Sequence, residues 1–106
     1  MQRKTLTENE ILNKLKEHTD ILRKYGVIRI GLFGSYVRGE QRESSDIDFM
    51  VEFKKANFDN FMDLALYLED LFHKKVELIT IGSLSPYIQP YIEKEIKWYE
   101  AELALP

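Results

Sequence analysis

The 106-residue chain has room for one hydrophobic core, so we expect a single domain spanning residues 1–106. It has no cysteine, which excludes disulfides and thiolate metal sites, and its net charge of −3 argues against direct, non-specific nucleic-acid binding. The N-terminal residues lack the apolar run of a signal peptide and no apolar run reaches membrane-spanning length, so we expect a cytoplasmic protein without a membrane partner.

The first predicted element is a helix from Thr7 to Tyr25. Thr7 and Glu10 have the spacing of a capping box, and Gly26 is a natural stop after the last turn. Apolar residues recur between them at helical spacing, at Ile11, Leu12, Leu15, Leu22 and Tyr25.

A strand and a sharp turn are predicted next. The apolar run from Val27 to Phe33 is long enough for one buried strand. Gly34 then permits a tight turn and the close approach of a ligand to the backbone. We expect Ser35 to cap a short helix over residues 35–40, whose first N–H groups and serine hydroxyl would form a site for phosphate oxygens.

Two aspartates open the second predicted strand, which runs from Asp46 to Phe53. Side chains alternate along a strand, so Asp46 and Asp48 would share one face while Ile47 points to the other. Two neighbouring carboxylates repel each other unless a cation lies between them. Mg²⁺ suits such a site, because it binds one or two carboxylates together with water and substrate phosphates.

The following segment predicts a helix from Phe58 to Phe72 and a strand from Val76 to Ile81. Along the helix an apolar stripe, predicted to pack in the core, contains Phe58, Phe61, Met62, Ala65, Leu68 and Phe72. The strand–helix–strand order places the new strand beside the one that carries the aspartates. Glu77 is the one carboxylate in this apolar run and either faces solvent or joins the acidic site.

The C-terminal part combines a proline-limited helix with several aromatic residues. Pro90 predicts that a regular helix begins near it and runs through Glu95. Lys97–Tyr99 could form either the last turn of that helix or a short edge strand, and we favour the strand. The aromatic residues could pack in the core or dock a partner, and we favour packing; they are Tyr87, Tyr91, Trp98 and Tyr99.

The stretch from Gly34 to Val51, GSYVRGEQRESSDIDFMV, resembles the minimal nucleotidyltransferase antitoxins of the DNA polymerase β-like superfamily. A glycine–serine turn or an Asp-x-Asp pair is common when alone; the spacing between them makes the resemblance specific. Matching residues are Ser35, Arg38, Gly39, Ser45, Asp46, Ile47 and Asp48. Val37 stands where the family usually has alanine, and Phe49 where it has leucine.

The resemblance implies an α/β (α+β) nucleotidyltransferase fold, a small mixed sheet flanked by helices. It implies ATP as substrate and one or two Mg²⁺ ions held by the catalytic carboxylates Asp46, Asp48 and Glu77. The residues it implies for nucleotide binding are Gly34, Ser35, Arg38 and Ser45. Glu77 replaces the family's usual aspartate, and its longer side chain could displace a metal or base by about 1.5 Å. Arg38 could instead be a solvated surface arginine.

The resemblance further implies the acceptor. Antitoxins of this family transfer AMP to a tyrosine of a partner HEPN-domain ribonuclease toxin, which would make that toxin the protein partner. A binding antitoxin weakened by Glu77, or a small-molecule nucleotidyltransferase, are the alternatives. The chain is short for an enzyme with its own acceptor domain, although a homo-oligomer could build an acceptor pocket.

Overall fold

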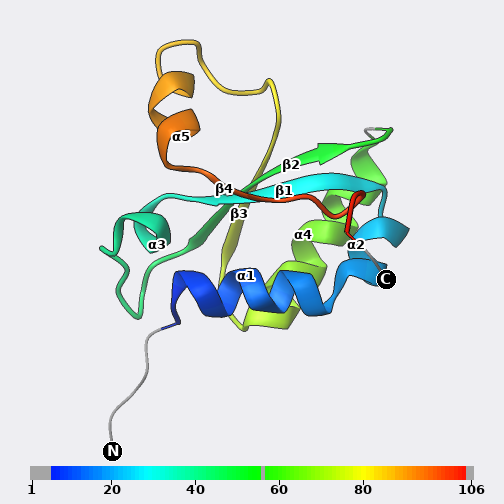
Figure 1. Ribbon diagram of the computed structural model, residues 1–106, viewed down its shortest axis with the longest axis horizontal. Coiled ribbons are helices and arrows are strands. Elements are labelled where there is room, and N and C mark those ends of the chain that lie inside the picture. Colours follow the sequence, from blue (N-terminus) through cyan, green and yellow to red (C-terminus); the bar gives the residue numbers. More distant parts are fainter. Residues whose placement is uncertain (1–5, 56, 105–106) are drawn as a thin grey trace, which may run out of the picture.

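A mixed sheet of four strands organises the molecule (Figure 1). The computed structural model describes residues 6–55 and 57–104. In chain order the elements are α1 Glu8–Glu17, α2 Thr19–Lys24, β1 Val27–Phe33, α3 Ser35–Arg38, β2 Ile47–Phe53, α4 Phe58–Phe72, β3 Val76–Thr80, α5 Gln89–Glu95 and β4 Lys97–Tyr99. The strand order is β3-β2-β1-β4, with β2 parallel to β3, and with β1 antiparallel to both β2 and β4.

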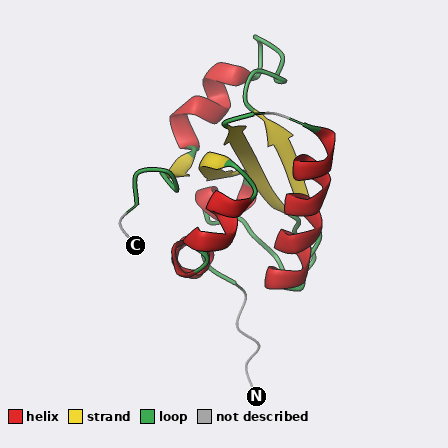
Figure 2. Ribbon diagram, turned by 90° about the vertical axis from the view of Figure 1, so that its right-hand side faces the viewer, coloured by secondary structure: helices red, strands yellow, loops and turns green. Residues whose placement is uncertain are grey.

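The two faces of the sheet are covered unequally. Helices α1, α2 and α4 cover one face, whereas α5 stands alone over the other (Figure 1). Figure 2 shows the same separation from the side, with α5 at the top. No residue of α5 is fully buried, so this helix contributes little to the core. Across residues 6–55 and 57–104, no helix has the length and apolar character needed to cross a membrane.

Side-chain alternation along β2 separates the core from the site. Ile47, Phe49 and Val51 are fully buried on the face that the helical layer covers. Asp48 and Glu52 are only partly buried, because they alternate with these residues and point to the opposite face. Helices α1, α2 and α4 complete the core with Ile11, Leu15, Leu22, Leu64, Leu68 and Phe72.

Most predicted elements are present in the structure. The bounds of β1 and α4 agree with the prediction, and Asn57 caps α4 by accepting a hydrogen bond from the N–H of Asn60. Strand β3 lies beside β2, as the strand–helix–strand order predicts. Lys97–Tyr99 is a short strand at the edge of the sheet, paired with β1. The small mixed sheet flanked by helices confirms the predicted fold class.

The predicted first helix is in fact two helices, and the prediction of one continuous helix is wrong. His18 has φ −113° and ψ 29°, outside helical values, and separates α1 from α2. Local hydrogen bonds stabilise the break, because the Thr19 hydroxyl donates to Lys16 O at 2.7 Å and a His18 ring nitrogen lies 2.8 Å from Lys14 O. The break changes the direction of the chain between α1 and α2, and Leu22 of α2 is buried in the core.

The predicted burial is wrong for four exposed apolar residues. Phe58 is 74% exposed and Met62 39%, because both lie outside the buried stripe of α4, which consists of Leu64, Leu68 and Phe72. Tyr87 and Tyr91 are 86% and 73% exposed, since they belong to α5 and the loop before it, on the sparsely covered side. The predicted packing holds only for Trp98 and Tyr99, which are partly buried.

Candidate functional site

The turn after β1 brings the backbone close to an aspartate. Gly34 has φ +84° and ψ −152°, which a residue with a side chain rarely adopts. A Cβ at this position would overlap Oδ2 of Asp48 and lie 3.1 Å from its Cγ. Both the backbone conformation and the neighbouring carboxylate therefore require glycine here.

The prediction that Ser35 caps the short helix is wrong. Gly34 occupies the N-cap of α3, and no side chain caps the helix. Because the conformation of Gly34 already turns the chain, Ser35 is the first helical residue. The helix ends at Arg38, two residues early, since Gly39 has φ +74° and its N–H bonds to Ser35 O. The N–H groups of Ser35 and Tyr36 lie in the first turn, where no helical carbonyl is available to accept them.

Three acidic residues lie near this turn, and pairing between strands sets their positions. Asp48 pairs with Phe33 at the end of β1 and, on its other side, with Glu77 of β3. Asp46 directly precedes β2, which begins one residue later than predicted. Asp48 is half-buried, whereas Asp46 and Glu77 are exposed. The sheet therefore brings Asp48 and Glu77 together from segments that are far apart in the sequence.

The pKa of the Asp48 carboxyl reflects its burial and the charged groups around it. Burial, followed by the negative charge of Glu77 and a hydrogen bond with it, raises the pKa of Asp48 to about 6. Asp46 also raises the pKa, and the positive charge of Arg38 lowers it. Asp48 and Glu77 thus destabilise each other when both are ionised, which is the situation that a bound cation relieves.

The acidic cluster offers the ligand atoms that Mg²⁺ prefers, but it does not form a complete coordination site by itself. Among the residues that the structure describes, no group of three acidic, histidine or cysteine side chains is arranged to hold a metal ion. Carboxylate oxygens are nevertheless the ligands that Mg²⁺ prefers, and one or two suffice when water and phosphate supply the rest. The donor set therefore fits the ion, with Asp46, Asp48 and Glu77 as the available residues.

Sequence reasoning missed the residue that occupies the turn. Glu95, at the end of α5, accepts a hydrogen bond from the Gly34 N–H at 2.6 Å. Its two oxygens also accept from one guanidinium nitrogen of Arg38, at 3.1 and 3.2 Å. Arg38 donates to Glu40 as well, at 2.8 Å, so the predicted nucleotide-binding arginine is paired with two carboxylates. No local sequence pattern indicates that Glu95 contacts this turn, because it lies 61 residues from Gly34 in sequence.

Ser45 makes hydrogen bonds within the loop that precedes β2. Its hydroxyl accepts a hydrogen bond from the Arg42 N–H at 2.8 Å, and its own N–H donates to Arg42 O at 2.9 Å. Ser45 thus closes the loop that delivers Asp46. Its predicted contact with nucleotide stays a prediction.

Comparison with known proteins places this geometry in a family. Residues 9–100 match the family model described as polymerase beta, nucleotidyltransferase. A Methanocaldococcus jannaschii protein, MJ1379, described provisionally as a protein adenylyltransferase, is 47% identical over 95 residues, covering 85% of this chain and 95% of its own length. Protein adenylyltransferase MntA of Thermococcus cleftensis is 41% identical over 93 residues, covering 86% of this chain and 94% of its own.

Solved structures agree with the sequence comparisons. A crystal structure of a toxin–antitoxin complex with AMP-PNP contains a chain with a TM-score of 0.66 and 28% identity, covering 82% of this chain and 70% of that one. A structure described provisionally as a minimal nucleotidyltransferase has a TM-score of 0.67 and 28% identity, covering 81% of this chain and 93% of that one.

Proposed function

Because the chain belongs to the polymerase β nucleotidyltransferase family, we propose that it transfers AMP from ATP to a tyrosine of a HEPN-domain ribonuclease toxin and so acts as the antitoxin. A relative named protein adenylyltransferase MntA supports a protein as the acceptor, and a neighbour from a toxin–antitoxin complex supports the role of antitoxin. One observation carries the proposal: the Asp48 carboxylate lies against the Gly34 turn and pairs with Glu77. This contact supports a site in which phosphate and metal bind side by side.

The turn after β1 would bind the nucleotide phosphates. The N–H groups of Gly34 and Ser35 and the guanidinium of Arg38 would hold the β- and γ-phosphates. The Gly34 N–H already donates to a carboxylate, that of Glu95, which supports its preference for anions. Ser45 would act at the edge of this region, by holding the loop before Asp46.

The acidic cluster would bind the metal ion and accept the proton that the acceptor hydroxyl releases. Asp46, Asp48 and Glu77 would hold one or two Mg²⁺ ions, which supply charge neutralisation at the phosphates. The acceptor oxygen attacks the α-phosphorus, and the bond from that phosphorus to pyrophosphate breaks. Exposed Glu77 would accept the proton from the acceptor hydroxyl, because it can reach solvent and partner more readily than half-buried Asp48.

Intact-mass spectrometry of the toxin tests the proposal. The purified chain is incubated with MgATP and the candidate HEPN partner, and the partner is then weighed. We expect a gain of one or more AMP masses, absent with EDTA and absent with the Asp46→Asn/Asp48→Asn variant. A stable complex without a mass change would overturn the transferase proposal for this partner and favour an antitoxin that acts by binding. Neither complex nor mass change, with ATP still turned over, would indicate a small-molecule acceptor.

Replacement of Glu95 by glutamine should tighten binding of the phosphate chain. The Glu95 carboxylate occupies two of the proposed phosphate donors, the Gly34 N–H and Arg38, and its negative charge repels an incoming phosphate. Removing that charge near the surface should lower the dissociation constant for Mg-tripolyphosphate about three- to tenfold, as measured by calorimetry. The matched control is Glu100→Gln, which removes the same charge from an exposed residue just after β4. Equal affinities in wild type and Glu95→Gln would show that Glu95 does not compete with phosphate.

A further inference from the structure

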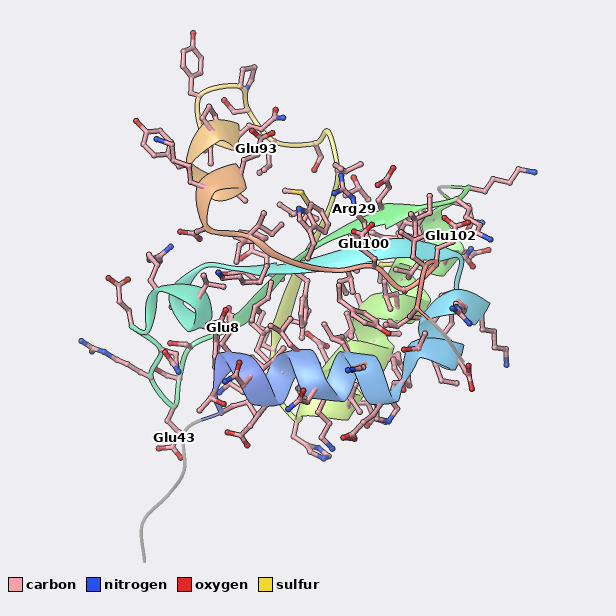
Figure 3. All side chains as sticks on the ribbon, viewed as in Figure 1. Glu8, Arg29, Glu43, Glu93, Glu100 and Glu102 are labelled. Atoms are coloured by element: carbon pink, nitrogen blue, oxygen red, sulfur yellow. The ribbon has the colours of Figure 1, made fainter. Side chains whose placement is uncertain are left out.

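Helix α5 is held to the rest of the molecule mainly at its C-terminal end. None of its residues is fully buried, and most are exposed. Figure 3 shows α5, marked by Glu93, on the side of the sheet opposite to Glu8 of α1. Ile96, directly after the helix, packs on β1, since a Cβ on Gly31 would lie 2.5 Å from Ile96 Cδ1. The helix therefore has one anchored end and one exposed end.

Glu95 makes the polar contacts of the anchored end. Within residues 6–55 and 57–104, the hydrogen bonds that join an α5 side chain to another element all involve Glu95. Its carboxylate accepts from the Gly34 N–H at 2.6 Å and from Arg38 at 3.1 and 3.2 Å. The Glu95 side chain is only 20% exposed, so these bonds are partly shielded from water and are stronger than they would be at the surface.

The Gly34 N–H can bind only one anion at a time. It carries a single hydrogen, which is donated to Glu95, whereas Arg38 has five donors to share among several acceptors. Arg38 already bonds to two carboxylates, those of Glu40 and Glu95, so its one positive charge faces two negative charges. A phosphate chain that enters this region meets an occupied donor and an excess of negative charge. Its binding to the Gly34 N–H therefore requires Glu95 to leave.

Departure of Glu95 should loosen α5 as a whole. The helix has seven residues, and Pro90 near its start lacks an N–H. Helices this short are not stable in water without contacts to the rest of a protein. The chain on either side can adjust, because Ile96 leaves the helix in an extended conformation and Gly82 has open space where a Cβ would be. The order of α5 therefore depends on the contact between Glu95 and the Gly34 turn.

We propose that Glu95 is an internal competitor of the nucleotide phosphates and that phosphate binding releases α5, an inference that rests on the function proposed above. When the Gly34 N–H bonds to Glu95, α5 is ordered and the phosphate site is closed. When the N–H bonds to phosphate, Glu95 is displaced and α5 opens. The apparent affinity for phosphate is thus reduced by the fraction of molecules in the closed form, and any contact that orders α5 lowers it further.

Hydrogen–deuterium exchange of the α5 amides tests the Glu95 contact without any ligand. Glu95→Ala should raise the exchange rate of α5 about tenfold over wild type, because hydrogen bonds to a charged group are lost. Alanine favours helix at least as well as glutamate, so a lower helix propensity cannot cause faster exchange. Glu93→Ala is the matched control, since Glu93 is exposed and bonds to Gln89 of the same helix, and its exchange should stay close to that of wild type. Glu95→Gln retains an acceptor oxygen and should fall between wild type and Glu95→Ala.

Mg-tripolyphosphate, which carries neither base nor sugar, tests the competition. In wild type, saturating Mg-tripolyphosphate should raise the exchange of the α5 amides to about the level of ligand-free Glu95→Ala. In Glu95→Ala it should cause no further increase, because no carboxylate remains to be displaced. The amides of β1 and β2 are the internal reference, and their exchange should not rise. Calorimetry on each protein shows separately whether the ligand binds.

The outcomes distinguish this inference from the proposed function. Slower or unchanged exchange of α5 in wild type with bound Mg-tripolyphosphate would overturn the inference, because Glu95 would then not be displaced. Equal exchange in ligand-free wild type and Glu95→Ala would overturn it as well, since Glu95 would then not order the helix. In both cases the proposed function stands if calorimetry shows that Mg-tripolyphosphate binds. If it binds to neither wild type nor Glu95→Ala, the proposed phosphate site is wrong and the inference falls with it.

Discussion

Replacement of Asp48 by asparagine is expected to lower the rate of AMP transfer about a thousandfold while making the metal-free protein more stable. The loss of activity follows because a bound metal contributes several kcal/mol to transition-state stabilisation, and each 1.36 kcal/mol is a factor of ten. Asparagine keeps the size of the side chain against Gly34 but removes the charge that would hold Mg²⁺. Single-turnover transfer to the toxin, measured at saturating MgATP, gives the rate.

The gain in stability follows from the pKa of Asp48. Burial and the charge of Glu77 raise this pKa from 3.8 to about 6, so the folded chain binds the proton more tightly than the unfolded chain. The favourable contribution is complete below the unfolded pKa of 3.8 and is lost as pH rises through about 6. At pH 7.5 the ionised carboxylate therefore destabilises the fold, by about 1–2 kcal/mol after allowance for its partial exposure to solvent.

Urea unfolding in EDTA measures this effect. At pH 7.5 the free energy of unfolding of Asp48→Asn should exceed that of wild type by about 1–2 kcal/mol, and the difference should shrink as the pH is lowered to 4. Asp63→Asn, at an exposed position on α4, is the control and should leave stability unchanged. A less stable Asp48→Asn variant at pH 7.5 would mean that the carboxylate cluster is not under repulsion.

Replacement of Gly34 by alanine is expected to reduce both stability and activity. The backbone conformation of Gly34, φ +84° and ψ −152°, is one that essentially only glycine adopts and costs an alanine about 1–3 kcal/mol; the overlap of its Cβ with Oδ2 of Asp48 adds about 1–3 kcal/mol. Relief of that overlap must move either the turn or the carboxylate, and a displacement near 1 Å can lower a rate about a hundredfold. Urea unfolding and the single-turnover assay measure the two effects.

Gly39→Ala is the matched control for this substitution. Gly39 also has a positive φ, +74°, but its ψ of 20° places it in the left-handed helical region, which costs a side chain less, and a Cβ there meets nothing within 4 Å. It should lose only the backbone contribution, about 1 kcal/mol, and retain activity. Equal losses of stability and activity in the two variants would mean that backbone strain alone accounts for the effect and that the close contact with Asp48 contributes nothing.

The sequence alone was sufficient for features that depend on local chemistry. The apolar run at β1, the bounds of α4 and the alternation around Asp48 each reflect interactions between near neighbours in the chain. The position of Glu77 beside Asp48 was predictable as well, because a strand–helix–strand unit places consecutive strands side by side.

Features that depend on long-range packing were not predictable. The exposure of Phe58 and Tyr91 follows from where α4 and α5 lie over the sheet, and helical periodicity does not contain that information. Glu95 is one of many acidic residues in the sequence, and only the folded chain brings it to the Gly34 N–H. The break at His18 arises from a choice between a helical turn and local hydrogen bonds, which differ little in free energy.

The hydrogen bond between the Gly34 N–H and Glu95 also has a consequence for folding during synthesis of the chain, because its two partners are made at different times. The Gly34 turn leaves the ribosome 61 residues before the carboxylate that it binds. In an unfinished chain β1 and β2 can already pair, since N-terminal segments emerge and fold first. Such a nascent chain would hold the turn and Asp48 but would lack Glu95. In such a chain the Gly34 N–H would lack its Glu95 partner until α5 has been made.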